Sequence, residues 1–145
     1  MILLSSALET TDNKKIIMNN LIIDAANEKI FLVLIKDKNI YSTTHTNSKT
    51  NYEKLIVLIN DLLKKHSLDI SKISKIYVNR GPGSFAGIRN SLSVVKAIYV
   101  AKKIDYFCFS FDDFDKTDDM NYENIPNLCD KLNIKKNLIN PIYLS

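Results

Sequence analysis

The residues with the clearest chemical potential lie in one stretch, Arg80 to Arg89, which reads Arg-Gly-Pro-Gly-Ser-Phe-Ala-Gly-Ile-Arg. It contains all three glycines and both arginines of the chain. Residues 75–79 before it are rich in β-branched and aromatic side chains, as in a strand, and residues 85–103 repeat apolar side chains with a helical period. A glycine turn between a strand and a helix gathers free amide groups, which favour an anion by about 0.3–2 kcal/mol. One interpretation is therefore an anion-binding loop, with the candidate residues Gly81, Pro82, Gly83, Ser84, Gly87 and Arg89.

The spacing of this stretch departs from the standard phosphate-binding motifs. A Walker A loop ends in Gly-Lys-Ser/Thr, whereas Gly87 precedes Ile88 and Arg89. The dinucleotide motif G-x-G-x-x-G would need one residue fewer between Gly83 and Gly87. The second interpretation, which this spacing favours, is a structural turn that packs the helix on the sheet, with Ser84 as helix N-cap and Gly83 at a positive φ.

The other polar residues predict neither catalysis nor metal binding. No nucleophile with a neighbouring acid–base pair is visible, and His45 and His66 do not form a His-x-x-x-His pair. Cys108 and Cys129 lack metal-binding spacing, so we expect buried or idle thiols. Asp24 ends a predicted strand without a following glycine, which favours a hydrogen-bonding role over a metal or phosphate site. We therefore expect no catalytic residue, no metal and no cofactor.

The composition is typical of one globular domain, with 145 residues of which 46% are hydrophobic. No apolar run approaches the roughly 20 residues of a membrane span, and Ile2-Leu3-Leu4 is too short for an export signal, so we expect a cytoplasmic protein without a membrane contact. The net charge of +4 is uneven: residues 1–110 carry 16 basic and 9 acidic groups, and residues 111–145 carry 4 and 7. Scattered lysines without interleaved aromatic residues favour a solvated surface over an RNA-binding patch.

The order of patterns predicts an α/β fold with a mixed five-stranded sheet flanked by helices. The predicted strands are residues 21–26, 28–36, 40–44, 75–79 and 106–110, and the predicted helices are residues 51–66 and 85–103. We divide the chain into an extension at 1–19, a lobe at 20–110 and a reduced acidic tail at 111–145, with a helix at 126–132 and a terminal strand at 141–144. The sequence leaves open whether the extension is disordered, forms a small extra element or precedes a translation start at Met18.

The predicted helix at 85–103 carries two apolar stripes. The first stripe is Phe85, Ile88, Leu92, Val95 and Tyr99, and the second, which includes small residues, is Gly87, Ser91, Val94, Ile98 and Ala101. Two stripes indicate packing on two sides, either within the domain alone or with a partner helix against the second stripe. In the latter case we expect Ser91→Arg to leave the domain folded and to prevent the partner from docking.

The motif from Gly81 to Arg89 resembles the GPGSFTGLR signature of the TsaB (YeaZ) family. The likeness extends over residues 20–110, which follow the element order of that family's first lobe, and Pro141-Ile142-Tyr143-Leu144 is similar to its closing Pro-x-Tyr-Leu-Arg, with Ser145 in place of the arginine. The resemblance implies a ribonuclease H-like lobe of the actin, Hsp70 and sugar-kinase superfamily, with the second lobe largely missing.

The same resemblance implies a function as the non-catalytic scaffold partner of a TsaD-family protein, in a heterodimer that makes N6-threonylcarbamoyladenosine at adenosine 37 of tRNA. It further implies a TsaE-family ATPase in the complex, only indirect contact with tRNA, and a homodimer when the chain is alone. The implied interface is Gly87, Ser91, Val94, Ile98 and Ala101, with Ile56 of the first helix. Two alternatives stay open: an anion- or nucleotide-binding enzyme that uses Asp24, and a homodimeric module with another partner.

Overall fold

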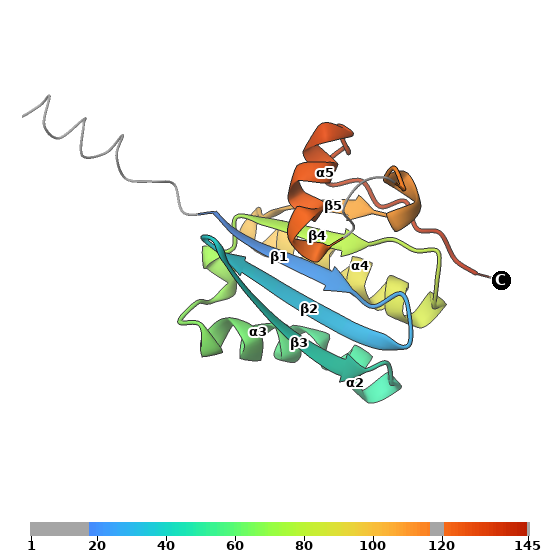
Figure 1. Ribbon diagram of the computed structural model, residues 1–145. Helices are drawn as coiled ribbons and strands as arrows, with labels where there is room; N and C mark the ends of the chain where they lie inside the picture. Colours follow the sequence, from blue (N-terminus) through green and yellow to red (C-terminus); the bar gives the residue numbers. More distant parts are fainter. Residues whose placement is uncertain (1–17, 117–120, 145) are drawn as a thin grey trace, which may run out of the picture.

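The computed structural model describes residues 18–116 and 121–144, which fold around one mixed sheet (Figure 1). The first three strands pair antiparallel as two consecutive hairpins, while β1, β4 and β5 pair in parallel. The strand order is β3-β2-β1-β4-β5, which confirms the predicted five-stranded α/β architecture. The strands are β1 Asn19–Asp24, β2 Lys29–Lys36, β3 Asn39–Thr46, β4 Lys75–Asn79 and β5 Asp105–Phe109.

Helices cover both faces of this sheet (Figure 1). Helices α2 (Lys49–Glu53), α3 (Leu55–Lys65) and α4 (Phe85–Lys102) lie on one face, and α5 (Ile125–Lys131) lies on the other. The prediction of one continuous helix over 51–66 was wrong, because Lys54 leaves helical geometry with φ −98° and ψ 9°. The helical segment also begins earlier than predicted, since the Ser48 side chain accepts a hydrogen bond from the Asn51 amide and caps α2.

Two hydrophobic cores follow from the two covered faces. The larger core lies between the sheet and α3 and α4, and includes Leu32, Ile59 and Val95. The smaller core lies on the opposite face, between the sheet and the C-terminal segment, whose described residues are 111–116 and 121–144. Its buried residues are Ile22, Val33, Tyr77, Phe109, Phe114, Ile125, Leu128 and Cys129. Phe114 therefore anchors the start of the acidic tail to the sheet.

The C-terminal segment returns to the sheet without forming a strand. Two isolated bridges tie it down, one between Phe107 and Lys136 and one between Gly83 and Tyr143. The predicted terminal strand at 141–144 was therefore wrong, and the predictions for residues 1–17 and 117–120 lie outside the described residues. Asn19, assigned to the extension, is already part of β1. Among the described helices, none has the length and apolarity that crossing a membrane requires.

Candidate functional site

The motif loop between β4 and α4 is bonded to the protein around it. Ser84 is the N-cap of α4, as predicted, because its Oγ accepts the Gly87 amide at 3.3 Å. The Ser84 amide donates to the carbonyl of Ala26 at 2.8 Å, and the Gly81 amide donates to Asn79 Oδ1 at 2.9 Å. Three amides that an anion site would use are thus engaged within the chain, which supports the structural interpretation of the loop.

The glycines of this loop permit close approach to the turn between β1 and β2. A Cβ on Gly83 would lie 2.1 Å from the Ala26 carbonyl oxygen, and one on Gly87 would lie 1.9 Å from that of Ala25. The expected positive φ at Gly83 was wrong; the residue in that conformation is Gly81, with φ 110°. The glycine requirement at 83 and 87 is therefore steric, and it holds the start of α4 against the end of β1.

Asp24 occupies the centre of a buried polar network at the ends of β1 and β4. Its side chain is 2% exposed, and its Oδ1 accepts hydrogen bonds from Asn79 Nδ2 at 2.9 Å and from the Ala26 amide at 3.3 Å. The Tyr122 hydroxyl donates to Asp24 Oδ2. Burial and this contact with the carboxylate raise the pKa of Tyr122, so the hydroxyl keeps its proton at neutral pH. Asp24 thus serves as a hydrogen-bond acceptor, and Tyr122 of the C-terminal segment covers it.

We expect Tyr122→Phe to lower the free energy of unfolding by about 1.5–3 kcal/mol, because it removes a hydrogen bond to a buried carboxylate. Urea unfolding of the two proteins measures this difference. Tyr143→Phe is the matched control, since Tyr143 is an exposed tyrosine, and we expect it to change stability by less than about 0.5 kcal/mol. Equal stability of Tyr122→Phe and the parent protein would contradict the role assigned to this hydroxyl.

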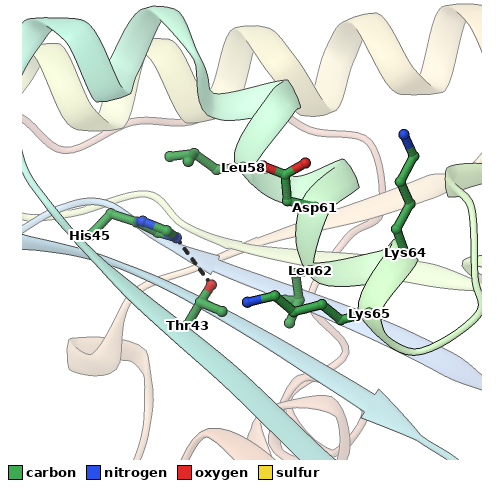
Figure 2. Close-up of a pocket in the computed structure, with 7 residues that line it drawn as sticks. All are labelled: Thr43, His45, Leu58, Asp61, Leu62, Lys64 and Lys65. Carbon is green, nitrogen blue, oxygen red and sulfur yellow. Dashed lines mark hydrogen bonds between the residues drawn. The ribbon is translucent and has the colours of Figure 1, made fainter.

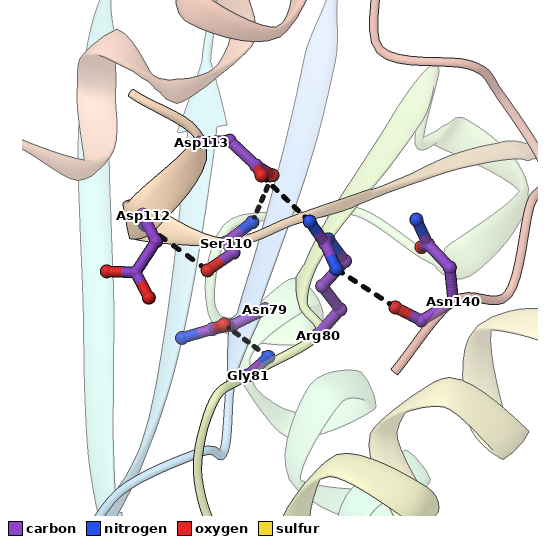
Figure 3. Close-up of polar contacts among 7 residues, drawn as sticks. All are labelled: Asn79, Arg80, Gly81, Ser110, Asp112, Asp113 and Asn140. Atoms are coloured by element: carbon purple, nitrogen blue, oxygen red, sulfur yellow. Dashed lines mark hydrogen bonds and ion pairs between the residues drawn. The ribbon is translucent and has the colours of Figure 1, made fainter. Parts of the chain in front are cut away.

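Arg80 connects the motif loop to both ends of the C-terminal segment (Figure 3). Its guanidinium forms an ion pair with Asp113 at 2.8 Å and donates to the Asn140 carbonyl at 3.2 Å. Asp113 also accepts the Ser110 amide at 2.8 Å, as part of a capping box that starts the turn at Phe111–Asp113. Sequence reasoning missed this clamp, although the Ser-x-x-Asp spacing at 110–113 is a recognisable capping signal.

A groove of about 530 Å³ runs between α3 and α4. Four of the predicted interface residues line it, namely Ile56, Val94, Ile98 and Ala101. Ala97 and Ser93 of α4 complete its α4 side, and Glu53, Asn60, Asn90 and Lys102 add polar groups to its lining. The groove therefore presents apolar and small side chains between polar ones.

The other two predicted interface residues lie beneath this surface. Ser91 is 0% exposed, and its Oγ donates to the Ile88 carbonyl at 3.0 Å. Gly87 is also buried, against Ala25. The expectation that Ser91 reaches the partner surface was wrong, because the face of α4 that packs against the rest of the protein takes residues from both stripes. Other residues of the stripes are exposed, such as Phe85, which is 54% exposed.

The remaining candidate residues do not assemble into a reactive centre. Arg89 is exposed and lies over the Phe85 ring, with 5.8 Å between Cζ and the ring centroid. Burial raises the pKa values of the Cys108 and Cys129 thiols to about 12, which agrees with the expected idle thiols. Within residues 18–116 and 121–144, no three His, Cys, Asp or Glu side chains are grouped as metal ligands would be.

Comparisons with known proteins find similarity over this lobe to proteins named for tRNA threonylcarbamoyladenosine. A family model described as "TsaD: tRNA N6-adenosine threonylcarbamoyltransferase" matches residues 39–109. Two curated proteins called "tRNA threonylcarbamoyladenosine biosynthesis protein TsaB", from different Buchnera aphidicola subspecies, also match. The one from the Baizongia pistaciae strain is 35% identical over 66 residues, covering 39% of this chain and 30% of the relative. The one from the Schizaphis graminum strain is 27% identical over 90 residues, covering 62% and 43%.

A solved structure, YeaZ from Pseudomonas aeruginosa, shares the fold with a TM-score of 0.60 and 24% identity, covering 64% of this chain and 44% of that one. The chain thus spans less than half the length of these relatives. Together with the glycine motif at the start of α4 and the five-stranded sheet that carries it, the matches to the curated proteins show that this part of the chain is similar to the TsaB (YeaZ) family.

Proposed function

We propose that this protein is a non-catalytic subunit in the biosynthesis of N6-threonylcarbamoyladenosine on tRNA, and that it binds and stabilises a TsaD-family protein as a heterodimer. The names of the curated relatives support the pathway. The proposal includes a TsaE-family ATPase in the same complex, contact with tRNA adenosine 37 only through the partners, and a cytoplasmic location.

The observation that carries the proposal is the groove between α3 and α4. Its floor and walls combine apolar Ile56, Val94 and Ile98 with the small residues Ala97 and Ala101. Small side chains let a second helix approach closely, and apolar ones release water when it docks. A helix of the partner, laid along α4, is the occupant that this groove fits best.

The buried network around Asp24 supports a non-catalytic role. A nucleotide-binding enzyme would have to present this carboxylate to its substrate. Here the carboxylate instead accepts hydrogen bonds from the Tyr122 hydroxyl, which covers it, and from the Asn79 side-chain amide. The amides of Gly81, Ser84 and Gly87 are engaged as well. These contacts weigh against the alternative of an anion- or nucleotide-binding enzyme, because both of its candidate elements are used inside the fold.

Ala97→Arg tests the interface. Ala97 is exposed in the groove, so an arginine there occupies the space of the partner helix without entering the core. We expect the variant to fold normally and to bind the TsaD-family protein of the same genome at least tenfold more weakly, a loss of about 1.4 kcal/mol or more. Circular dichroism measures folding, and calorimetric titration with the purified partner measures binding.

Val100→Arg is the matched control, because Val100 is 63% exposed on the same helix and does not line the groove. We expect it to bind like the parent chain. Parent-like binding by Ala97→Arg would move the interface away from α3 and α4, and failure of the parent chain to bind would contradict the proposed function itself.

A further inference from the structure

Helix α4 carries basic side chains and no acidic one. Its sequence from Phe85 to Lys102 includes Arg89 and Lys96 but neither Asp nor Glu. Phe85, Arg89 and Lys96 follow one another at spacings of four and seven residues, so they share one face of the helix over about 16 Å of its length. All three side chains are exposed. This face of α4 is therefore positively charged, with an aromatic ring at its first turn.

The end of the chain lies beside this face. Residues 134–144, called the closing segment, contain two lysines and no acidic residue. The Asn137 amide donates to the Tyr106 carbonyl of β5 at 2.7 Å, and the Leu144 amide donates to the Gly83 carbonyl at 3.3 Å. The closing segment therefore runs from β5 to the start of α4 (Figure 1).

A small groove of about 180 Å³ lies between α4 and the closing segment. Arg89, Ser93 and Lys96 line it from α4, and Ile139 and Tyr143 line it from the closing segment. No Asp or Glu is among the described residues that line it. The groove thus combines cationic and apolar side chains without a carboxylate that would offset the positive charge.

Two exposed aromatic rings lie together beside this groove. Phe85 is 54% exposed and Tyr143 is 40% exposed, which makes them the most exposed Phe and Tyr side chains of the part of the chain that the structure describes. Their ring centroids are 4.7 Å apart, and Arg89 Cζ lies 5.8 Å from the Phe85 centroid. Because the two rings are 58 positions apart in the printed sequence, only the fold brings them together with the cations.

Two acidic residues lie near the closing segment, and both are paired with a cation. Asp105 pairs with Lys136 at 3.6 Å. Asp113 pairs at 2.8 Å with Arg80, whose guanidinium also donates to the Asn140 carbonyl. These ion pairs leave the positive charge of the groove on α4 in place.

A larger hollow elsewhere on the protein shows the contrast. It measures about 510 Å³ and lies between β3 and α3, where Lys64 and Lys65 are accompanied by Asp61 (Figure 2). His45 on its β3 side is hydrogen-bonded to Thr43, and no Phe or Tyr is among its described lining residues. Its charge is therefore mixed, and it offers no aromatic ring.

We propose that Phe85, Arg89, Lys96 and Tyr143 form a site that binds an unpaired segment of RNA. The arginine and the lysine neutralise phosphates, and the bases of a single strand stack on exposed aromatic rings. A duplex keeps the faces of its bases stacked, so it would use only the cations. The groove is too small for a protein helix, which is about 10–12 Å wide. This site goes beyond the proposed function and leaves adenosine 37 to the partners.

Fluorescence anisotropy of the full chain with a fluorescein-labelled, twelve-nucleotide oligoadenylate tests the site. We expect saturable binding that weakens as salt is added, because phosphate contacts release counterions. We expect the single strand to bind at least fivefold more tightly than its duplex with oligouridylate, whose bases cannot stack on the rings.

Two variants separate the rings from the charges. Phe85→Leu keeps an apolar side chain but removes a ring, and we expect at least fivefold weaker binding with an unchanged salt dependence. Lys96→Gln is expected to weaken binding at least threefold and to lower the slope of log affinity against log salt by about 0.7. Lys64→Gln is the matched control, since it removes the same charge from the hollow of Figure 2, and we expect it to bind like the parent. Circular dichroism checks that each variant is folded.

The absence of saturable binding by the parent chain would overturn the inference. Equal losses for Lys96→Gln and Lys64→Gln would overturn it as well, because any surface charge would then suffice, and parent-like binding by Phe85→Leu would exclude stacking. Displacement of the oligonucleotide by phosphatidylserine vesicles or by polyglutamate, at equal concentrations of negative charge, would assign the surface to a membrane or to an acidic protein instead. The assay contains no TsaD-family protein, so its outcome is separate from that of the proposed function.

Discussion

Ser91→Arg is expected to unfold the domain or to lower its free energy of unfolding by about 3–5 kcal/mol. The side chain of Ser91 is 0% exposed, between Ile88 and Val95 on the buried face of α4. An arginine there would place a charge without a partner in the larger core, and breaking or omitting the partner of a buried charge has a cost of this size. Small domains are stable by only about 5–15 kcal/mol. Far-ultraviolet circular dichroism and thermal melting measure the effect.

Ala97→Arg is the control, because it adds the same side chain to the same helix at an exposed position. We expect its melting curve to stay close to that of the parent protein. If Ser91→Arg melts like Ala97→Arg, then Ser91 is accessible in solution. In that case the whole second stripe, from Gly87 to Ala101, would again be the expected partner surface.

Gly83→Ala is expected to lower the free energy of unfolding by about 3 kcal/mol or more. The added Cβ would lie 2.1 Å from the Ala26 carbonyl oxygen, a contact that only a backbone shift can relieve. That shift would weaken the hydrogen bond from the Ser84 amide to the same carbonyl, now 2.8 Å long, and would move the start of α4. Overpacking and backbone shifts in a close-packed region cost about 1–3 kcal/mol, and the lost bond adds about 1 kcal/mol. Urea unfolding gives the value.

Ser84→Ala sets the scale for this experiment, because it removes the α4 cap without adding an atom near Ala26. We expect it to cost about 1 kcal/mol. Gly83→Ala with a cost no larger than that of Ser84→Ala would show that the loop yields easily and that steric contact is not the reason for the glycine.

Local patterns were sufficient to predict the five strands of the sheet, the long helix α4 and its cap. Alternating and β-branched residues define β2 and β4, and the apolar period from Phe85 onward defines α4. Ser84 acts as a cap through atoms three residues away in sequence. These features depend on interactions within one element or between neighbours, so the sequence contains the information needed to recognise them.

The burial of each stripe on α4 could not be predicted from the helical period alone. The period shows that two apolar stripes exist, but the direction in which the helix faces the sheet depends on contacts with α2, α3 and the turn after β1, which are distant in sequence. These contacts bury Ser91 and expose Phe85. The same holds for Gly83, whose neighbour across the contact is Ala26, 57 positions earlier in the printed sequence.

By itself, the amino-acid sequence determined the α/β class, the mixed sheet, the glycine turn before α4 and the likeness to the TsaB family. Only the tertiary structure decided that Tyr122 covers Asp24, that Arg80 joins Asp113 and Asn140, and that an open groove lies between α3 and α4. The physical reason is that secondary structure follows mainly from short-range periodicity. Polar networks and grooves form where segments distant in sequence meet, because their geometry depends on how the packed cores orient each element.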